Sequence, residues 1–521
     1  MVSPQPAATG VRQAEVVGSL SLVVDLAMGQ PLEQGMRRAL LAVWLGEELG
    51  LSGEQLSTVY YVAQLGTVGC TLELTALASF VQDEIAVAGQ FPFVDPAQPV
   101  EVAGLFLRNA GAGEPLPRRL RKIVAAARDG SGQVQMICRD VATRVGDMID
   151  LGPAVRQALG HCLERWDGKG RPRGLKGEEV HLAARIFAVA HDAEIFNRVR
   201  GMDAVLTVMR KRSGTVYDPR LAERFQQVAR TLLPRLDREG TWDGVLSAEP
   251  APPRWLTQDK LDEMMKAIAG FVDSRSAYTF GHSAGVAWLA ETAARGLGLG
   301  ESEAAEIRRA GLLHDLGRAG VPIGIWDKAD PLTEREWARM QRHPSLTELV
   351  LARSEALGHL GTLAGLHHER LDGSGYRRLP GPFLSTGGMI LAAADLYQTK
   401  TEPRPHREAL TPDAAADEVR RQARAGLLDP EVVSALLDAT GHRARPRKHE
   451  LPSGLTEREG EVLRLLVNGL SNRQMAERLY VSPKTVGNHI EHIYGKIGVS
   501  TRVGATLFAL QHELGQGAPY P

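Results

Sequence analysis

The stretch 310–316, AGLLHDL, sets His314 and Asp315 side by side at the end of an apolar run. The apolar spacing before them predicts a helix. Burying an adjacent imidazole and carboxylate costs several kcal/mol unless a metal or another partner satisfies them. Taken alone, the pair also fits a helix end with a solvated aspartate and a core histidine. The residues on either side favour a different interpretation.

Composition limits the class of protein. A chain of 521 residues with 43% hydrophobic and 24% charged residues is expected to form about three globular domains. Aromatic residues are sparse at 5%, which favours helices over sheets. The net charge of -1 gives no overall field that would attract nucleic acid or membranes. Three cysteines make no disulfide framework, no run of about 18 apolar residues occurs, and the start MVSPQPAATG is unlike a signal peptide. We therefore expect a cytoplasmic protein without membrane contact.

Two linkers divide the chain. LSAEPAPPRW at 246–255 holds three prolines, which cannot continue a helix, and GHRARPRKHELPSG at 441–454 carries a small basic cluster. We predict five segments: a flexible tail at 1–13, a helical domain at 14–245, a second at 256–440, a linker at 441–452 and a terminal bundle at 453–515.

An internal repeat relates the first two helical domains. ERWDG at 164–168 matches ERLDG at 369–373, and LGEELGL at 45–51 matches ARGLGL at 294–299. Anchoring on these runs pairs residues with equal separations inside each copy, and the pairs are Gln34 with His282, Gly66 with His314, Cys138 with His343, and Cys162 with His367. We infer one helical domain used twice.

The two copies differ in their polar residues. The second copy has His282, His314, Asp315, His343, His367, His368 and Asp395, where the first has Gln34, Gly66, Thr67, Cys138, Cys162, Leu163 and His191. If those histidines and aspartates served only folding, the first copy would need them too. The difference indicates chemistry in the second copy and a structural or sensory role for the first.

Five histidines and two aspartates within 114 residues supply enough donors for two divalent metal ions. A mixed imidazole and carboxylate set suits Fe, Mn, Co or Ni better than structural zinc. Asp315 is the natural bridging ligand because its carboxylate has two oxygens. Two such ions would hold a phosphate for in-line attack. Single histidines on apolar faces are usually core residues, so this interpretation depends on the whole set.

Five motifs in order resemble the HD-GYP subgroup of HD-domain phosphohydrolases over about 260–440: GHSAGVAWLA (281–290), LLHDLGRAGVP (312–322), MQRHP (340–344), HHERLDGSGY (367–376) and AAADLYQTKTEPRPHR (392–407). The resemblance implies an all-helical domain whose two-metal centre hydrolyses cyclic di-GMP. It implies that the metal ligands are His282, His314, Asp315, His343, His367, His368 and Asp395, and that His314, Asp315 and Arg318 are catalytic. The substrate contacts that it implies are Arg318, Asp372, Gly375, Tyr376, Arg404 and Arg407.

Three positions depart from the family pattern. Arg318 stands where a lysine is usual, which keeps the charge but changes the geometry. The GYP triplet reads Gly375-Tyr376-Arg377, and Tyr278 occupies the place of a glutamate that supports a third metal in some members. We therefore expect two metals. The first copy resembles a degenerate member, in which Cys138 and Cys162 fit buried structural cysteines better than metal ligands.

The last segment, 453–515, has the sequence pattern of a different kind of domain. TEREGEVLRLLV at 456–467 begins with a threonine cap and acidic residues, and Ser482 with Pro483 begins a later helix. That helix turns small polar and basic side chains outward, as a major-groove reader requires. A dimerisation bundle is the alternative, because 453–515 has seven Lys/Arg against six acidic residues.

The run LTEREGEVLRLLVNGLSNRQMAERLYVSPKTVGNHIEHIYGKIGVSTR closely resembles the LuxR-type helix-turn-helix. The resemblance implies that Lys484, Thr485, Asn488 and His489 face DNA, with Lys496 and Arg502 near phosphates. Gly487 replaces a larger polar residue, and the linker residues Arg443, Arg445, Arg447 and Lys448 would add sequence-independent attraction.

The prediction is an all-α chain of two tandem HD-type helical domains followed by a small helix-turn-helix bundle. We expect a homodimeric transcription regulator that binds double-stranded DNA and senses or hydrolyses a phosphorylated nucleotide, cyclic di-GMP or a relative, with two divalent ions such as Fe or Mn. The alternatives are a regulator whose HD domains bind a ligand or partner without turnover, and an enzyme whose terminal bundle only dimerises.

Overall fold

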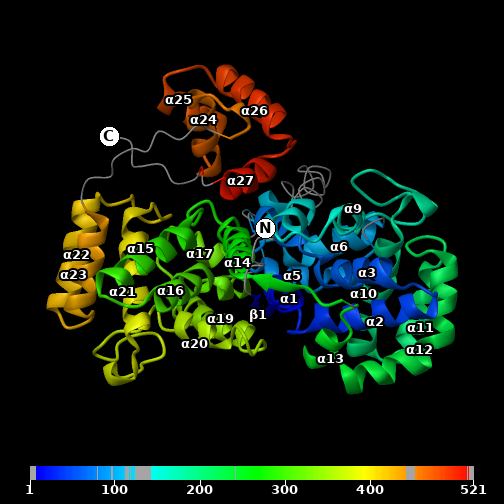
Figure 1. The fold of residues 1–521 in the computed structure, drawn as a ribbon. Helices are drawn as coiled ribbons and strands as arrows, with labels where there is room; N and C mark the ends of the chain where they lie inside the picture. Colours follow the sequence, from blue (N-terminus) through cyan, green and yellow to red (C-terminus); the bar gives the residue numbers. More distant parts are fainter. Residues whose placement is uncertain are drawn as a thin grey trace, which may run out of the picture. The chain divides into compact units, whose positions relative to one another are not determined.

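A computed structural model describes residues 8–78, 80–95, 98–111, 117, 119–123, 142–240, 242–250, 252–441, 452–512 and 514. The described chain is mostly helical, as the sequence predicts, and divides into two compact units, Met1–Leu261 and Asp262–Pro521 (Figure 1). No helix in these residues is long and apolar enough to cross a bilayer. Cys138 and the four basic linker residues Arg443, Arg445, Arg447 and Lys448 lie outside the described residues.

The first unit is a helical array with one two-stranded ribbon. Its elements are β1 (Ala8–Arg12), α1 (Gln13–Ala27), α2 (Gln34–Glu48), α3 (Gly53–Leu65), α4 (Cys70–Leu77), α5 (Glu84–Ala88), η1 (Phe91–Phe93), α6 (Pro99–Asn109), α9 (Pro153–Leu159), η2 (Gly177–Glu179), α10 (Leu182–Arg200), α11 (Met202–Arg212), α12 (Pro219–Glu239), α13 (Trp242–Ser247) and β2 (Trp255–Thr257). Buried aliphatic residues on α1, α2, α3 and α10 form its core.

The ribbon corrects two sequence predictions. Residues 8–12, predicted to belong to a flexible tail, form β1, which pairs antiparallel with β2. The predicted linker 246–255 likewise begins inside α13 and ends in β2. Strand pairing across more than 240 residues is a non-local contact, and a five-residue segment has too little periodicity to reveal it.

The HD-type part of the second unit repeats this arrangement of helices. Its elements are α14 (Gln258–Asp273), α15 (His282–Gly296), α16 (Glu301–Leu313), η3 (Leu316–Gly320), α17 (Ile323–Trp326), α18 (Glu334–Met340), α19 (His343–Leu351), α20 (Gly358–Ala364), η4 (Gly381–Phe383), α21 (Thr386–Thr401), α22 (Pro412–Arg424) and α23 (Pro430–Thr440). Helices α2 and α15 are both 15 residues long, and α3 and α16 are both 13.

The ERxDG loops show the same local construction in both copies. Glu164 accepts the backbone amides of Arg173 and Leu175 at 2.8 and 3.0 Å. Glu369 accepts those of Arg377 and Leu379 at 2.8 and 2.9 Å. Because buried amides need partners, this glutamate holds the loop that follows it. The shared sequence run therefore has a shared structural role.

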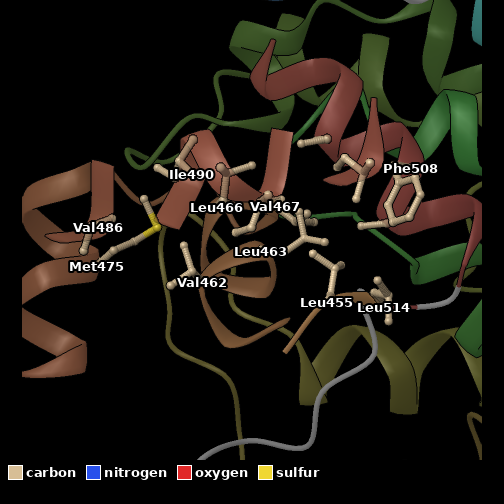
Figure 2. Close-up of a cluster of buried hydrophobic side chains, with 14 of the residues drawn as sticks. Leu455, Val462, Leu463, Leu466, Val467, Met475, Val486, Ile490, Phe508 and Leu514 are labelled. Carbon is tan, nitrogen blue, oxygen red and sulfur yellow. The ribbon is translucent and has the colours of Figure 1, made fainter. Parts of the chain in front are cut away.

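The C-terminal part is a small bundle of η5 (Pro452–Gly454), α24 (Glu457–Val467), α25 (Asn472–Leu479), α26 (Pro483–Ile497) and α27 (Arg502–Gln511). Thr456, Ser471 and Ser482 cap α24, α25 and α26 through their side-chain oxygens. Figure 2 shows the apolar residues that fill its centre, with Val462, Leu463, Leu466 and Val467 contributed by α24.

Candidate metal centre

Seven side chains from separate elements converge in the second unit. His282 is the first residue of α15, His314 and Asp315 follow α16, and His343 is the first residue of α19. His367 and His368 follow α20, and Asp395 lies within α21. Six of the seven are buried, and His368 is partly exposed. The structure thus brings together all seven residues that the sequence analysis selected.

Asp315 lies at the middle of the group. Its Oδ2 is 3.7 Å from His282 Nε2 and 3.5 Å from His314 Nε2. Its Oδ1 is 3.3 Å from His343 Nε2 and 3.7 Å from His367 Nε2. The two oxygens therefore face different pairs of imidazoles, as a carboxylate that bridges two cations would.

Asp395 lies between His282 and His368. Its Oδ1 lies 3.2 Å from His282 Nε2, and its Oδ2 lies 3.6 Å from His368 Nδ1. Two groups of potential ligand atoms result, one from His282, His314 and Asp315 and the other from His343, His367 and His368.

Backbone contacts fix the tautomers of three of these histidines. The Nδ1 atoms of His314, His343 and His367 each lie 2.7 Å from a carbonyl oxygen three residues earlier. A carbonyl only accepts, so each Nδ1 must donate and each neutral ring turns a bare Nε2 inward. His343 Nε2 and His367 Nε2 are 3.1 Å apart, and two facing lone pairs repel unless a cation lies near both. His314 Nε2 is buried without a hydrogen-bond partner in the described chain.

His282 is held differently. Its Nδ1 lies 2.9 Å from Glu402 Oε2, and Glu402 also accepts from Arg404 at 2.9 Å and from Gln398 at 2.7 Å. A carboxylate behind a metal-ligating histidine orients the ring and raises its basicity. The sequence analysis missed Glu402. Its position seven residues after Asp395, at the C-terminal cap of α21, was the available signal.

The protonation states suit metal binding. Burial lowers the pKa of His367 to about 3 and the pKa of His314 below its usual value, so both rings are neutral. Burial alone would raise the pKa of Asp315, but the cationic and hydrogen-bonding groups around it, Arg318 among them, outweigh burial and hold that pKa well below its usual range. Neutral imidazoles beside ionised carboxylates are the ligand forms that divalent ions require. At His282, burial is outweighed by Glu402 and Asp395, which raise the pKa to about 10, so that ring must release a proton when a cation binds. The donor set therefore fits two oxygen- and nitrogen-preferring cations.

Arg318 lies beside the centre. Its Nη1 is 3.0 Å from Asp315 Oδ2, and its guanidinium stacks on Trp326 at 3.9 Å from the ring centroid. The Tyr376 ring packs 4.3 Å from His368. Both predicted substrate contacts thus adjoin metal-centre residues.

The remaining predicted substrate residues have varied surroundings. Asp372 is exposed and accepts the Ser374 amide at 2.9 Å. A side chain at Gly375 would come within 2.5 Å of Glu369 Cα, so only glycine fits there. Arg404 pairs with Glu402. The Arg407 Nη1 donates to three carbonyls around the end of α21, the oxygens of Lys400, Glu402 and Glu408.

The helix-turn-helix residues divide into two groups. On α26, Lys484 and Asn488 are exposed, while Thr485 and His489 are half-buried. Lys496 instead pairs with Glu459 at 2.6 Å, and Arg502 donates to the Leu466 carbonyl at 2.9 Å. The DNA roles of all six stay predictions.

Two family models match the chain. "HD domain" matches residues 148–221 and 266–432, and "Bacterial regulatory proteins, luxR family" matches 453–509. The 3′3′-cGAMP-specific phosphodiesterase 3 of Vibrio cholerae is 29% identical over 434 residues, covering 82% of this chain and 94% of that protein. The chain contains an HD domain of the HD-GYP/cGAMP phosphodiesterase family and carries a C-terminal LuxR-type domain.

Other members of this family match a shorter part. The cyclic di-GMP phosphodiesterase response regulator RpfG of Xanthomonas campestris is 35% identical over 183 residues, covering 34% of this chain and 48% of its own. A crystal structure of the V. cholerae cyclic GMP-AMP-specific phosphodiesterase V-cGAP3 aligns with a TM-score of 0.58 and 25% identity, covering 83% of this chain and 98% of that one. The resemblance stated from sequence is therefore confirmed.

Proposed function

We propose that the second unit hydrolyses a 3′,3′-cyclic dinucleotide with two divalent ions, and that cyclic GMP-AMP is its first candidate substrate. The convergence of five histidines and Asp315 on two groups of ligand atoms, with Asp395 next to His282 and His368, carries this proposal. The sequence analysis expected cyclic di-GMP or a related nucleotide. The relative that matches both helical units acts, by its name, on cGAMP, whereas the cyclic di-GMP relative RpfG matches 34% of the chain.

Each residue has a role that follows from its contacts. Divalent ions held by the seven donors would polarise a phosphodiester and activate water for in-line attack. The backbone carbonyls and Glu402 keep the imidazoles turned inward. Arg318 places a delocalised charge beside Asp315, where it would contact a phosphate oxygen.

The direct test is hydrolysis by the full chain reconstituted with Mn or Fe. The substrates are 3′,3′-cGAMP, cyclic di-GMP and the 2′,3′-linked isomer, and the products are separated by chromatography. We expect linear dinucleotide from the first substrate, and His314→Ala should lower the rate at least about 1,000-fold, since a metal site supplies several kcal/mol. A metal-loaded protein that leaves all three nucleotides intact would refute the proposal.

A second candidate is a sensor that binds the nucleotide without turnover. Arg377 favours it, because it replaces the proline of the family triplet and pairs with Glu348 at 2.7 Å. Calorimetry separates the two functions. Micromolar binding of a cyclic dinucleotide with no linear product would establish the sensor.

We also propose that the LuxR-type domain reads duplex DNA as a homodimer on a paired site, with Lys484, Thr485, Asn488 and His489 toward the groove and Lys496 and Arg502 near the backbone. Lys484→Ala should weaken salt-sensitive duplex binding by about 1–3 kcal/mol, as expected for one lost contact to a base edge. Lys169→Ala in the first unit is the matched control. Equal duplex binding by wild type and Lys484→Ala would contradict the role of Lys484.

A further inference from the structure

The first unit holds a buried cation where the second unit gathers its ligands. Arg38, on α2, is fully buried. Its Nε donates to the Ala63 carbonyl and its Nη2 to the Gln64 carbonyl at 3.0 Å. Its Nη1 lies 3.0 Å from His191 Nδ1 and 3.4 Å from Gln34 Oε1. One guanidinium therefore joins the start of α2, the end of α3 and the middle of α10.

These partners are the counterparts of the metal-centre residues. The repeat pairs Gln34 with His282 and His191 with Asp395. Ala63 precedes Gly66 by three residues, as Gly311 precedes His314. The carbonyl that receives the Arg38 Nε thus corresponds to the one that receives the His314 Nδ1.

The chemistry of the pairings fits a permanent cation. A guanidinium has five donors and no acceptor, so His191 Nδ1 must accept. Burial, followed by Arg38 itself, lowers the pKa of His191 well below its usual value, which leaves the ring neutral. Burial lowers the pKa of Arg38, and the buried carboxyls Asp25 and Glu194 oppose that shift.

The position that corresponds to His314 has no room for a side chain. A side chain at Gly66 would come within 2.3 Å of the Phe187 ring, and the Arg38 guanidinium lies 5.0 Å from that ring's centroid. Burial raises the pKa of the Cys162 thiol, and its Sγ donates to the Ala158 carbonyl at 3.4 Å. A protonated thiol is not a metal ligand.

We infer that Arg38 is the first unit's built-in substitute for metal: a covalently attached cation that holds α2, α3 and α10 together. The first unit is then a metal-independent domain whose packing does not respond to metal supply. This inference does not depend on the second unit being a hydrolase.

The test is segment-resolved hydrogen exchange on the full chain. Arg38→Met keeps the length of the side chain and removes the charge, so protection of 34–48 and 182–200 should fall at least about 100-fold, the scale of an unpaired buried charge network. Arg38→Lys keeps the charge without the planar fork and should fall between Arg38→Met and wild type. Arg220→Met, at an exposed arginine of the same unit, should change nothing.

Chemical rescue distinguishes a bound cation from simple filling of space. In Arg38→Ala, low-millimolar guanidinium should restore much of the lost protection of 182–200, and the same concentration of sodium should not. If Arg38→Met fails to fold, Arg38→Lys carries the comparison. Wild-type protection retained in Arg38→Met, or restoration of Arg38→Ala by Mn alone, would overturn the inference.

Discussion

The two helical units have matching helices but different polar and charged residues at their centres. Helices α2 and α15 match in length and start after residues with left-handed backbones, Glu33 with φ 73° and Gly281 with φ 76°. At the centre, however, one unit has a guanidinium among acceptors, and the other has imidazoles and carboxylates with Arg318 beside them, 3.0 Å from Asp315. The positive charge in the first unit is covalently attached, whereas the donor set of the second unit fits divalent ions.

The different centres also explain why a histidine present in one unit is absent from the other. With Arg38 in place, a histidine at position 66 is unnecessary and would strike Phe187. In the second unit, the Nε2 atoms of His343 and His367 face each other at 3.1 Å, where one cation could contact both.

The largest effect is expected from placing an arginine in the second unit at the position that corresponds to Arg38. Val286 is buried four residues into α15, as Arg38 is four residues beyond Gln34 on α2. In Val286→Arg the guanidinium should occupy the metal centre, so bound metal and hydrolysis should fall to background, at least about 1,000-fold for the rate. Val286→Met is the volume control. Full metal content in a folded Val286→Arg protein would show that the two centres are not equivalent.

Chelation should affect only one unit. An ion present at 100 times its Kd stabilises its site by about 2.7 kcal/mol, which corresponds to about 100-fold in exchange protection. Removing metal from the full chain should expose 282–296 and 386–401 to exchange by that factor. Segments 34–48 and 182–200 should be unaffected, and a parallel loss there would contradict a metal-independent first unit.

Substitution of Glu402 tests how much the orientation of the His282 ring contributes to metal affinity. Glu402→Gln keeps the size of the side chain but weakens its hold on His282 Nδ1, so metal affinity should fall about 10- to 100-fold. Titration with Mn measures this affinity without reference to catalysis. The exposed Glu408→Gln is the control, and equal affinities in the two variants would remove Glu402 from the centre.

The smallest expected effect is a pH dependence in the first unit. Burial raises the pKa of Asp25 to about 8, and Arg38 opposes that rise. A carboxyl with a higher pKa when folded than when unfolded makes folding less favourable as the pH rises between the two values, and the loss stops above the folded pKa. Without Arg38 the folded pKa is higher, so the loss continues past pH 8.

The free-energy difference between wild type and Arg38→Met should therefore grow by about 1 kcal/mol from pH 7 to pH 9. Urea unfolding followed by pulse labelling of 182–200 measures it. A difference that shrinks with rising pH would mean that Arg38 does not act on Asp25.

The sequence predicted the helical class, the repeat and the set of seven converging residues. Histidine and aspartate are rare enough on apolar faces that their loss in one copy was informative. Arg38 could not be found in this way, because the comparison examined only positions where the second copy has a donor, and Val286 has none. The long arginine side chain reaches that centre from one turn further along the helix.

The pairing of side chains that are distant in the sequence could not be predicted either. Lys496 has the charge expected near a phosphate, yet its ammonium meets Glu459, 37 residues earlier in the chain. Glu402 supports His282 from 120 residues away. Such partners depend on how helices pack, which spacing along one helix does not encode.

The most direct measurement is the metal content of the purified full chain and two mirrored variants, Asp315→Ala and Thr67→Ala. The two residues occupy paired positions in the repeat, so each variant removes the same place from one copy. We predict two ions per chain in wild type and in Thr67→Ala, and fewer than one in Asp315→Ala. Loss of metal in Thr67→Ala, or two ions retained in Asp315→Ala, would contradict the account.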